Sequence, residues 1–127
     1  FEGACPYHGD CVEGLASGQA VLAHAGLPAE HLSRNDPAWD VVVSALTALF
    51  HNLVLTTGPE RILLGGGLGM GQAHLLPRLR AALMQSLNGY GIADRLASGI
   101  DTFLTQPGLG HRAGPLGALA LAIDAKR

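Results

Sequence analysis

The chain has 127 residues, a length that suits one small domain. Hydrophobic residues make up 48% of it and charged residues only 14%, so an apolar core can form and disorder is not expected. The net charge is −2 and no basic run is present, which argues against nucleic-acid binding by this segment. No apolar stretch approaches the roughly 20 residues of a membrane span, and the first residues do not resemble a signal peptide, so we expect a cytoplasmic protein.

Three side chains that bind metal ions well lie in the first dozen residues. Cys5, His8 and Cys11 are evenly spaced in a segment that contains glycine and proline, and they include the only two cysteines of the chain. Thiolate and imidazole are good zinc ligands, and short turns bring such ligands together. We therefore predict a zinc site on this loop. A disulfide between the two cysteines is the alternative, which the intervening histidine and the lack of a secretory signal disfavour.

The kind of zinc site depends on the fourth ligand, because only three ligands are visible and closed structural sites take four. An open fourth position would suit a water molecule in a catalytic site. A structural site would instead take a ligand from upstream of residue 1, since a helix is expected between the loop and His24. Glu13, which follows the cluster, is either a helix-start carboxylate stabilised by the helix dipole or a fixed acceptor for substrate hydroxyls.

The middle of the chain predicts helices. Residues 15–24 predict a short helix that Gly26 and Pro28 end, and residues 29–36 predict a loop. Asp36 is the expected N-cap of the next helix, with Pro37 at its first position. Apolar residues recur at helical spacing from 39 to 54, and Gly58–Pro59 ends this pattern. A polar stripe is expected along the opposite side of the helix: Asp40, Ser44, Thr47 and His51.

The remaining segments alternate between strands and helices. The apolar run 61–64 predicts a buried strand that leads into glycines 65–67. Leucines at helical spacing predict a helix that ends at Asn88–Gly89, residues 102–105 predict a second strand, and residues 114–125 predict a last helix. Glycines between a strand and a helix let backbone N–H groups approach a nucleotide, although a triple glycine alone is more often a turn, and neither a Walker loop nor a dinucleotide motif is completed.

This alternation predicts an α/β fold with parallel strands flanked by helices. The glycine run and the loop 106–112 both follow strands, and the carboxyl ends of parallel strands form the ligand-binding edge of a sheet. We therefore expect both loops to line one crevice, with His111 and Arg112 either facing it or on the surface. Only two strands are visible, and a two-stranded parallel sheet is not a stable unit, so we expect the sheet to be incomplete without an N-terminal half.

The string Cys5-Pro-Tyr-His8-Gly-Asp-Cys11-Val-Glu13-Gly-Leu-Ala-Ser-Gly18 resembles the zinc loop of the ROK family of sugar kinases and repressors, in the form of its fructokinase-like branch. The segment Ile62-Leu-Leu-Gly65-Gly66-Gly67 is similar to the adenosine-contacting strand and turn of that family. The resemblance covers the whole chain, but only the C-terminal part of the usual length of the family.

The resemblance implies an actin-like lobe of ribonuclease-H type, within a two-lobe kinase that transfers the γ-phosphate of MgATP to a hexose, with fructose as the expected hexose. Residues 1–127 would form the C-terminal lobe portion, with the zinc loop at 5–13 and a nucleotide-side α/β unit at 36–127. The implied residue roles are structural zinc binding by Cys5, His8 and Cys11, hexose binding by Glu13, and nucleotide binding by Gly65, Gly66, Gly67 and Leu68.

The resemblance assigns no catalytic residue to the chain, because the catalytic aspartate, the phosphate-binding segment and the fourth zinc ligand of the family lie upstream of the zinc loop. We therefore expect the chain to be inactive without its N-terminal half. The family resemblance also suggests a homodimer. Two alternatives stay open: the effector-binding half of a sugar-responsive ROK repressor, and a stand-alone zinc-binding interaction module. The sequence does not identify the hexose.

Overall fold

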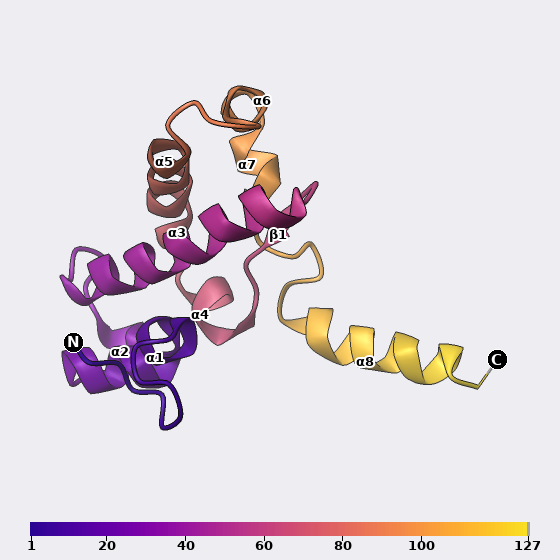
Figure 1. Cartoon of the computed structure of the whole chain (residues 1–127). Coiled ribbons are helices and arrows are strands. Elements are labelled where there is room, and N and C mark those ends of the chain that lie inside the picture. Colours follow the sequence, from indigo (N-terminus) through magenta and orange to yellow (C-terminus); the bar gives the residue numbers. More distant parts are fainter. Residues whose placement is uncertain (127) are drawn as a thin grey trace.

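The computed structural model describes residues 1–126, which form a set of helices and one small two-stranded parallel sheet (Figure 1). The elements, in chain order, are α1 (Val12–Ala16), α2 (Gly18–Ala25), the 3₁₀ turn η1 (Ala29–His31), α3 (Ala38–Thr57), β1 (Ile62–Leu63), α4 (Gly66–Gly71), α5 (Leu75–Leu87), α6 (Ala93–Ala97), α7 (Ile100–Phe103), β2 (Leu104–Thr105), the 3₁₀ turn η2 (Gly110–Arg112) and α8 (Ala113–Asp124).

Helix α3 lies at the centre of the fold and packs against α5, α1 and α2. Its apolar residues recur every three or four positions, so they form one face that is buried in the core. The leucines of α5 have the same spacing and face α3. Each fully buried leucine contributes about 1.5–3 kcal/mol to folding, which makes this helix pair the main source of stability. The core residues from the two helices are Trp39, Val42, Leu46, Phe50, Val54, Leu75, Leu76, Leu79, Leu83 and Leu87.

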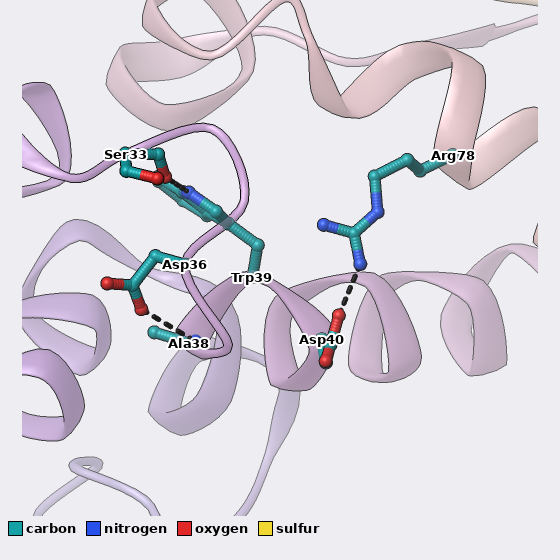
Figure 2. A network of polar contacts seen from close by, with 6 residues as sticks. All are labelled: Ser33, Asp36, Ala38, Trp39, Asp40 and Arg78. Carbon is teal, nitrogen blue, oxygen red and sulfur yellow. Dashed lines mark hydrogen bonds and ion pairs between the residues drawn. The ribbon is translucent and has the colours of Figure 1, made fainter.

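Two hydrogen bonds fix the start of α3 (Figure 2). The N-cap of α3 is Pro37 rather than the predicted Asp36, and the helix begins one residue later than expected. A carboxylate oxygen of Asp36 still accepts from the backbone N–H of Ala38, the first helical residue, at 2.9 Å. The indole N–H of Trp39 donates to the carbonyl of Ser33 at 2.8 Å. Because the Trp39 side chain is fully buried, this bond removes the penalty of leaving its polar N–H unpaired.

Three residues of the predicted polar stripe, Asp40, Ser44 and Thr47, line a hollow between α3 and α5. Asp40 forms an ion pair with Arg78, as Figure 2 shows. The hydroxyl of Ser86 lies 2.8 Å from Nδ1 of His51, so this histidine of the stripe is hydrogen-bonded to α5. Thr47 departs from the predicted stripe: it is only 9% exposed, because α5 covers this side of α3.

The two strands pair in parallel, as predicted, with Ile62 opposite Leu104 and Leu63 opposite Thr105. The boundaries of the second strand were predicted wrongly. Thr102 and Phe103 belong to α7, because the carbonyl of Gly99 accepts hydrogen bonds from both of their backbone N–H groups and closes a helical turn.

The predicted helix over residues 15–24 is in fact two helices. Ser17 has extended backbone angles, which end α1 at Ala16. Its hydroxyl accepts from the backbone N–H of Ala20 at 3.1 Å and caps α2. The short elements η1, α4 and α6 were not predicted, because one or two turns leave no readable apolar period.

Helix α8 projects away from the other elements (Figure 1). It contains no buried residue, and Leu119 and Leu121 are 56% and 73% exposed. A Cβ atom at Gly114 or Gly117 would meet nothing within 4 Å, so these glycines pack closely against nothing within residues 1–126. A helix that is apolar on all sides is usually buried.

By length and composition α3 is long and apolar enough to cross a membrane, contrary to the expectation that no segment would be. It is also the helix that α1, α2 and α5 cover. The core helix of a globular unit meets the same criterion, so this segment is weak evidence for a membrane span.

Candidate functional site

The three predicted zinc ligands converge. The sulfur atoms of Cys5 and Cys11 and a ring nitrogen of His8 all lie within 4.8 Å of one another, and Cys5 Sγ is 3.8 Å from His8 Nδ1. Tetrahedral zinc with ordinary bond lengths separates a sulfur and a nitrogen ligand by about 3.6 Å. The donor set and its spacing therefore fit a zinc ion. Both cysteines are free, so the alternative of a disulfide is not seen.

The loop that carries these ligands is closed by its own backbone. Cys5 and Gly9 form a short antiparallel bridge with hydrogen bonds of 3.3 and 3.0 Å, and Gly9 has a positive φ of 59° that glycine adopts without strain. The N–H of Ala4 donates to the carbonyl of Gly14 at 2.8 Å and ties the loop to α1. A Cβ atom at Gly14 would lie 1.9 Å from the carbonyl oxygen of Gly9. The loop can therefore rest on α1 only because residue 14 has no side chain.

The loop also favours the metal-binding form of a cysteine. The backbone N–H groups of Tyr7 and then of His8 hold the pKa of the Cys5 thiol below its usual value, while burial acts in the opposite direction. The thiolate is the form that binds zinc.

A fourth protein ligand is not found within residues 1–126. His24 lies outside the Cys5–His8–Cys11 cluster, and its ring packs against Phe1 with 4.7 Å between ring centroids. Although the chain breaks into two helices at Ser17, His24 does not reach the loop. This agrees with the expectation that His24 would not supply the fourth ligand.

Glu13 lies in the first turn of α1, two residues after Cys11, and is exposed. It lines a hollow of about 460 Å³ together with Cys5, Ser17 and Gly18. The position suits both predicted roles, since a carboxylate there is stabilised by the helix dipole and also faces a space that can hold a small polar ligand.

The predicted glycine run forms a turn and then the short helix α4. Gly66 has a φ of 73°, and a Cβ atom at Gly69 would lie 2.8 Å from the carbonyl oxygen of Leu64, so both positions require glycine. Gly67 and Leu68 line a second hollow, of about 450 Å³. Gly65 and Gly66 precede these two residues in the turn and do not line this hollow.

The walls of this second hollow differ from the predicted crevice. The loop 106–112 does contact the turn, because the side-chain amide of Gln106 donates to the carbonyl of Gly69 at 2.7 Å. The opposite wall, however, comes from η1 and α2, while His111 and Arg112 are exposed on η2. Sequence analysis missed the residues of that wall, since no local pattern reveals a contact between segments some 40 positions apart. They are Gly18 of α2 and Ala29 and Glu30 of η1, whereas Gln72, which also lines the hollow, directly follows α4.

Gly18 lines both hollows, which therefore adjoin. The hollow beside Glu13 and the hollow beside Gly67 and Leu68 form two parts of one groove. A Cβ atom at Gly18 would meet nothing within 4 Å, so no neighbouring atom crowds the position that the two hollows share.

Fold and site together define an α/β protein in which a Cys–His loop and a glycine turn face one groove. The chain belongs to the ROK family, whose family model matches residues 1–125.

Curated relatives of the chain are fructokinases. The chain is 35% identical over 122 residues to a fructokinase of Pediococcus pentosaceus, and this match covers 96% of the chain and 41% of the relative. It is 35% identical over 125 residues to a putative fructokinase of Bacillus subtilis, covering 98% of the chain and 42% of the relative. It is 39% identical over 90 residues to a fructokinase of Lactococcus lactis subsp. cremoris, covering 71% and 31%. The chain thus spans about two-fifths or less of the length of these relatives.

The contact at Gly14 makes a testable prediction. Replacing Gly14 by Ala places a methyl group on the Gly9 carbonyl, so the loop must move away from α1, and we expect a loss of about 1–3 kcal/mol in the free energy of unfolding. Gly18→Ala is the matched control, because it also adds a methyl group to a helical glycine but meets no neighbour, and its effect should stay within about 1 kcal/mol. Urea denaturation measures both. Equal stability of the two variants would show that the loop does not rest on α1 as described.

Proposed function

We propose that the chain is part of a fructokinase-like enzyme that transfers the γ-phosphoryl group of MgATP to a hexose, with fructose as the substrate. Membership of the ROK family and the fructokinase relatives support a sugar kinase. The observation that carries the proposal is the junction at Gly18. The hollow beside Glu13 and the hollow beside the glycine turn adjoin there, as the acceptor and donor sites of a phosphotransferase must.

The proposed roles follow from the chemistry of each wall. The carboxylate of Glu13 accepts hydrogen bonds from hexose hydroxyls and orients the sugar. The turn formed by Gly65, Gly66, Gly67 and Leu68 binds the nucleotide, because residues without side chains let the ligand approach the backbone. Phosphoryl transfer depends mainly on positioning the two reactants and on electrostatic stabilisation, so two fixed and adjoining pockets supply much of what the reaction needs.

Zinc in this proposal has a structural role. Cys5, His8 and Cys11 hold the ion, and the metal fixes the loop that leads into Glu13. The fourth ligand comes from a part of the protein outside this chain. Zinc binding would therefore stabilise one wall of the sugar pocket and take no part in the chemical step.

We propose further that the rest of the protein completes an actin-like, two-lobe kinase. Residues 1–127 form a C-terminal lobe portion, with the zinc loop at 5–13 and the nucleotide-side unit at 36–127. Three observations support this: the chain spans about two-fifths of its relatives, its parallel sheet has two short strands, and α8 is apolar and exposed. The remaining part would supply further strands, the catalytic base and a surface for α8. We propose a cytoplasmic homodimer as the working form.

The proposed function predicts different activities for two proteins. The intact protein should phosphorylate fructose in an ATP-dependent manner, whereas residues 1–127 alone should show no turnover above background, because the catalytic base is absent from the chain. A coupled assay of ADP release with a panel of hexoses measures both. Robust turnover by residues 1–127 alone would contradict the proposal that the active site is divided between this chain and the rest of the protein. Sugar-dependent DNA binding by an inactive intact protein would favour the repressor alternative.

The zinc proposal predicts the effect of removing one ligand. The intact protein should contain about one zinc ion per chain. Cys11→Ser should lose most of this zinc on dialysis and melt at a lower temperature, because metal binding stabilises the folded state. His24→Gln, which removes a histidine outside the cluster, should keep its zinc. Elemental analysis and thermal melting measure these quantities, and full zinc retention by Cys11→Ser would exclude the site.

A further inference from the structure

We propose that Glu30 binds the ribose hydroxyls of the nucleotide and so marks the nucleoside end of the groove. This inference rests on the proposed nucleotide site, which it makes more specific: it assigns a residue that neither the glycine run nor the Cys–His loop identifies. Three features support it: the place of Glu30 in the hollow, the way the structure holds that place, and the charge of its side chain.

Glu30 lines the hollow of about 450 Å³ that Gly67 and Leu68 also line. It does not line the hollow beside Glu13, which shares only Gly18 with the first. Glu30 therefore lies in the part of the groove that is not shared with the proposed sugar pocket.

A long-range hydrogen bond holds Glu30 in this position. The side-chain amide of Gln72, at the end of α4, donates to the carbonyl of Ala29 at 3.0 Å, across 43 positions of the chain. The backbone N–H of Gln72 donates in turn to the carbonyl of Leu68 at 2.9 Å. This pair of bonds connects η1 to the helix that follows the glycine turn, and so holds Glu30 near Leu68.

The chemistry of Glu30 then limits what it can bind. Within residues 1–126 its carboxylate forms no hydrogen bond or ion pair, and the residue is exposed in the hollow. An ionised carboxylate only accepts hydrogen bonds and repels phosphate oxygens, so it disfavours the triphosphate beside it. Ribose offers two neighbouring hydroxyl donors that one carboxylate can accept together, as acidic residues do in other nucleotide sites. The phosphates then extend from Glu30 towards Gly18, the residue that lines both hollows.

A titration of the intact protein tests this assignment. Dissociation constants for ATP, 2′-deoxy-ATP and 3′-deoxy-ATP are measured by calorimetry for the unchanged protein and for Glu30→Gln. A hydrogen bond to a charged group is worth about 1.5–3 kcal/mol, so Glu30→Gln should weaken ATP binding about tenfold or more. It should weaken binding of the deoxynucleotides much less, because the hydroxyl partner is already missing and the two losses do not add.

Glu60→Gln is the matched control, since Glu60 is an exposed glutamate outside the groove, and it should leave all affinities unchanged. Equal ATP affinity of Glu30→Gln and the unchanged protein would overturn the assignment. An equal loss for ATP and both deoxynucleotides would also overturn it, since it would indicate contact with the base. If the unchanged protein binds no ATP, the proposed function itself fails, and the first titration shows this separately.

Discussion

The close approach of Gly9 to Gly14 is the constraint on which the rest of the site depends. Because residue 14 has no side chain, the loop of Cys5, His8 and Cys11 can lie directly on α1. Helix α1 in turn packs against α3, the helix at the centre of the core. The orientation of the metal-binding loop, and of Glu13 beside it, is thus set by the apolar core rather than by the loop alone. A metal ion bound there would reinforce an arrangement that the backbone already favours.

Local sequence patterns predicted the parts of the fold that local physics determines. The long apolar period of α3 and the end of α5 at Asn88, which has a positive φ of 46°, agree with the structure, and the start of α3 differs from the prediction by one residue. The break at Ser17 was missed because a serine cap inside a helical pattern competes with helix continuation, and the sequence does not show which one prevails. The helical turn at Thr102 was missed because β-branched and aromatic residues favour strands only when a partner strand is available.

The candidate site likewise has one part that local sequence patterns predict and another part that they do not. The three metal donors lie within seven residues, so their spacing alone predicted that they converge, and the structure agrees. The wall formed by Ala29 and Glu30 was not predictable, because it depends on a hydrogen bond from Gln72 that joins distant segments. The prediction that the loop 106–112 lines the groove followed the general rule for parallel sheets. In this chain that loop instead contacts α4 through the side chain of Gln106, and η1 rather than the loop lines the hollow beside the glycine turn.

The central claim is that the Cys–His loop serves as a scaffold for Glu13, which binds the sugar. Calorimetric titration of fructose and ATP into the intact protein and its Glu13→Gln variant tests this claim most directly, with zinc content measured on the same samples. The account predicts that Glu13→Gln keeps its zinc and its ATP affinity but binds fructose about tenfold or more weakly, because a charged acceptor of the sugar hydroxyls is lost. Unchanged fructose affinity in a zinc-replete Glu13→Gln protein would contradict it.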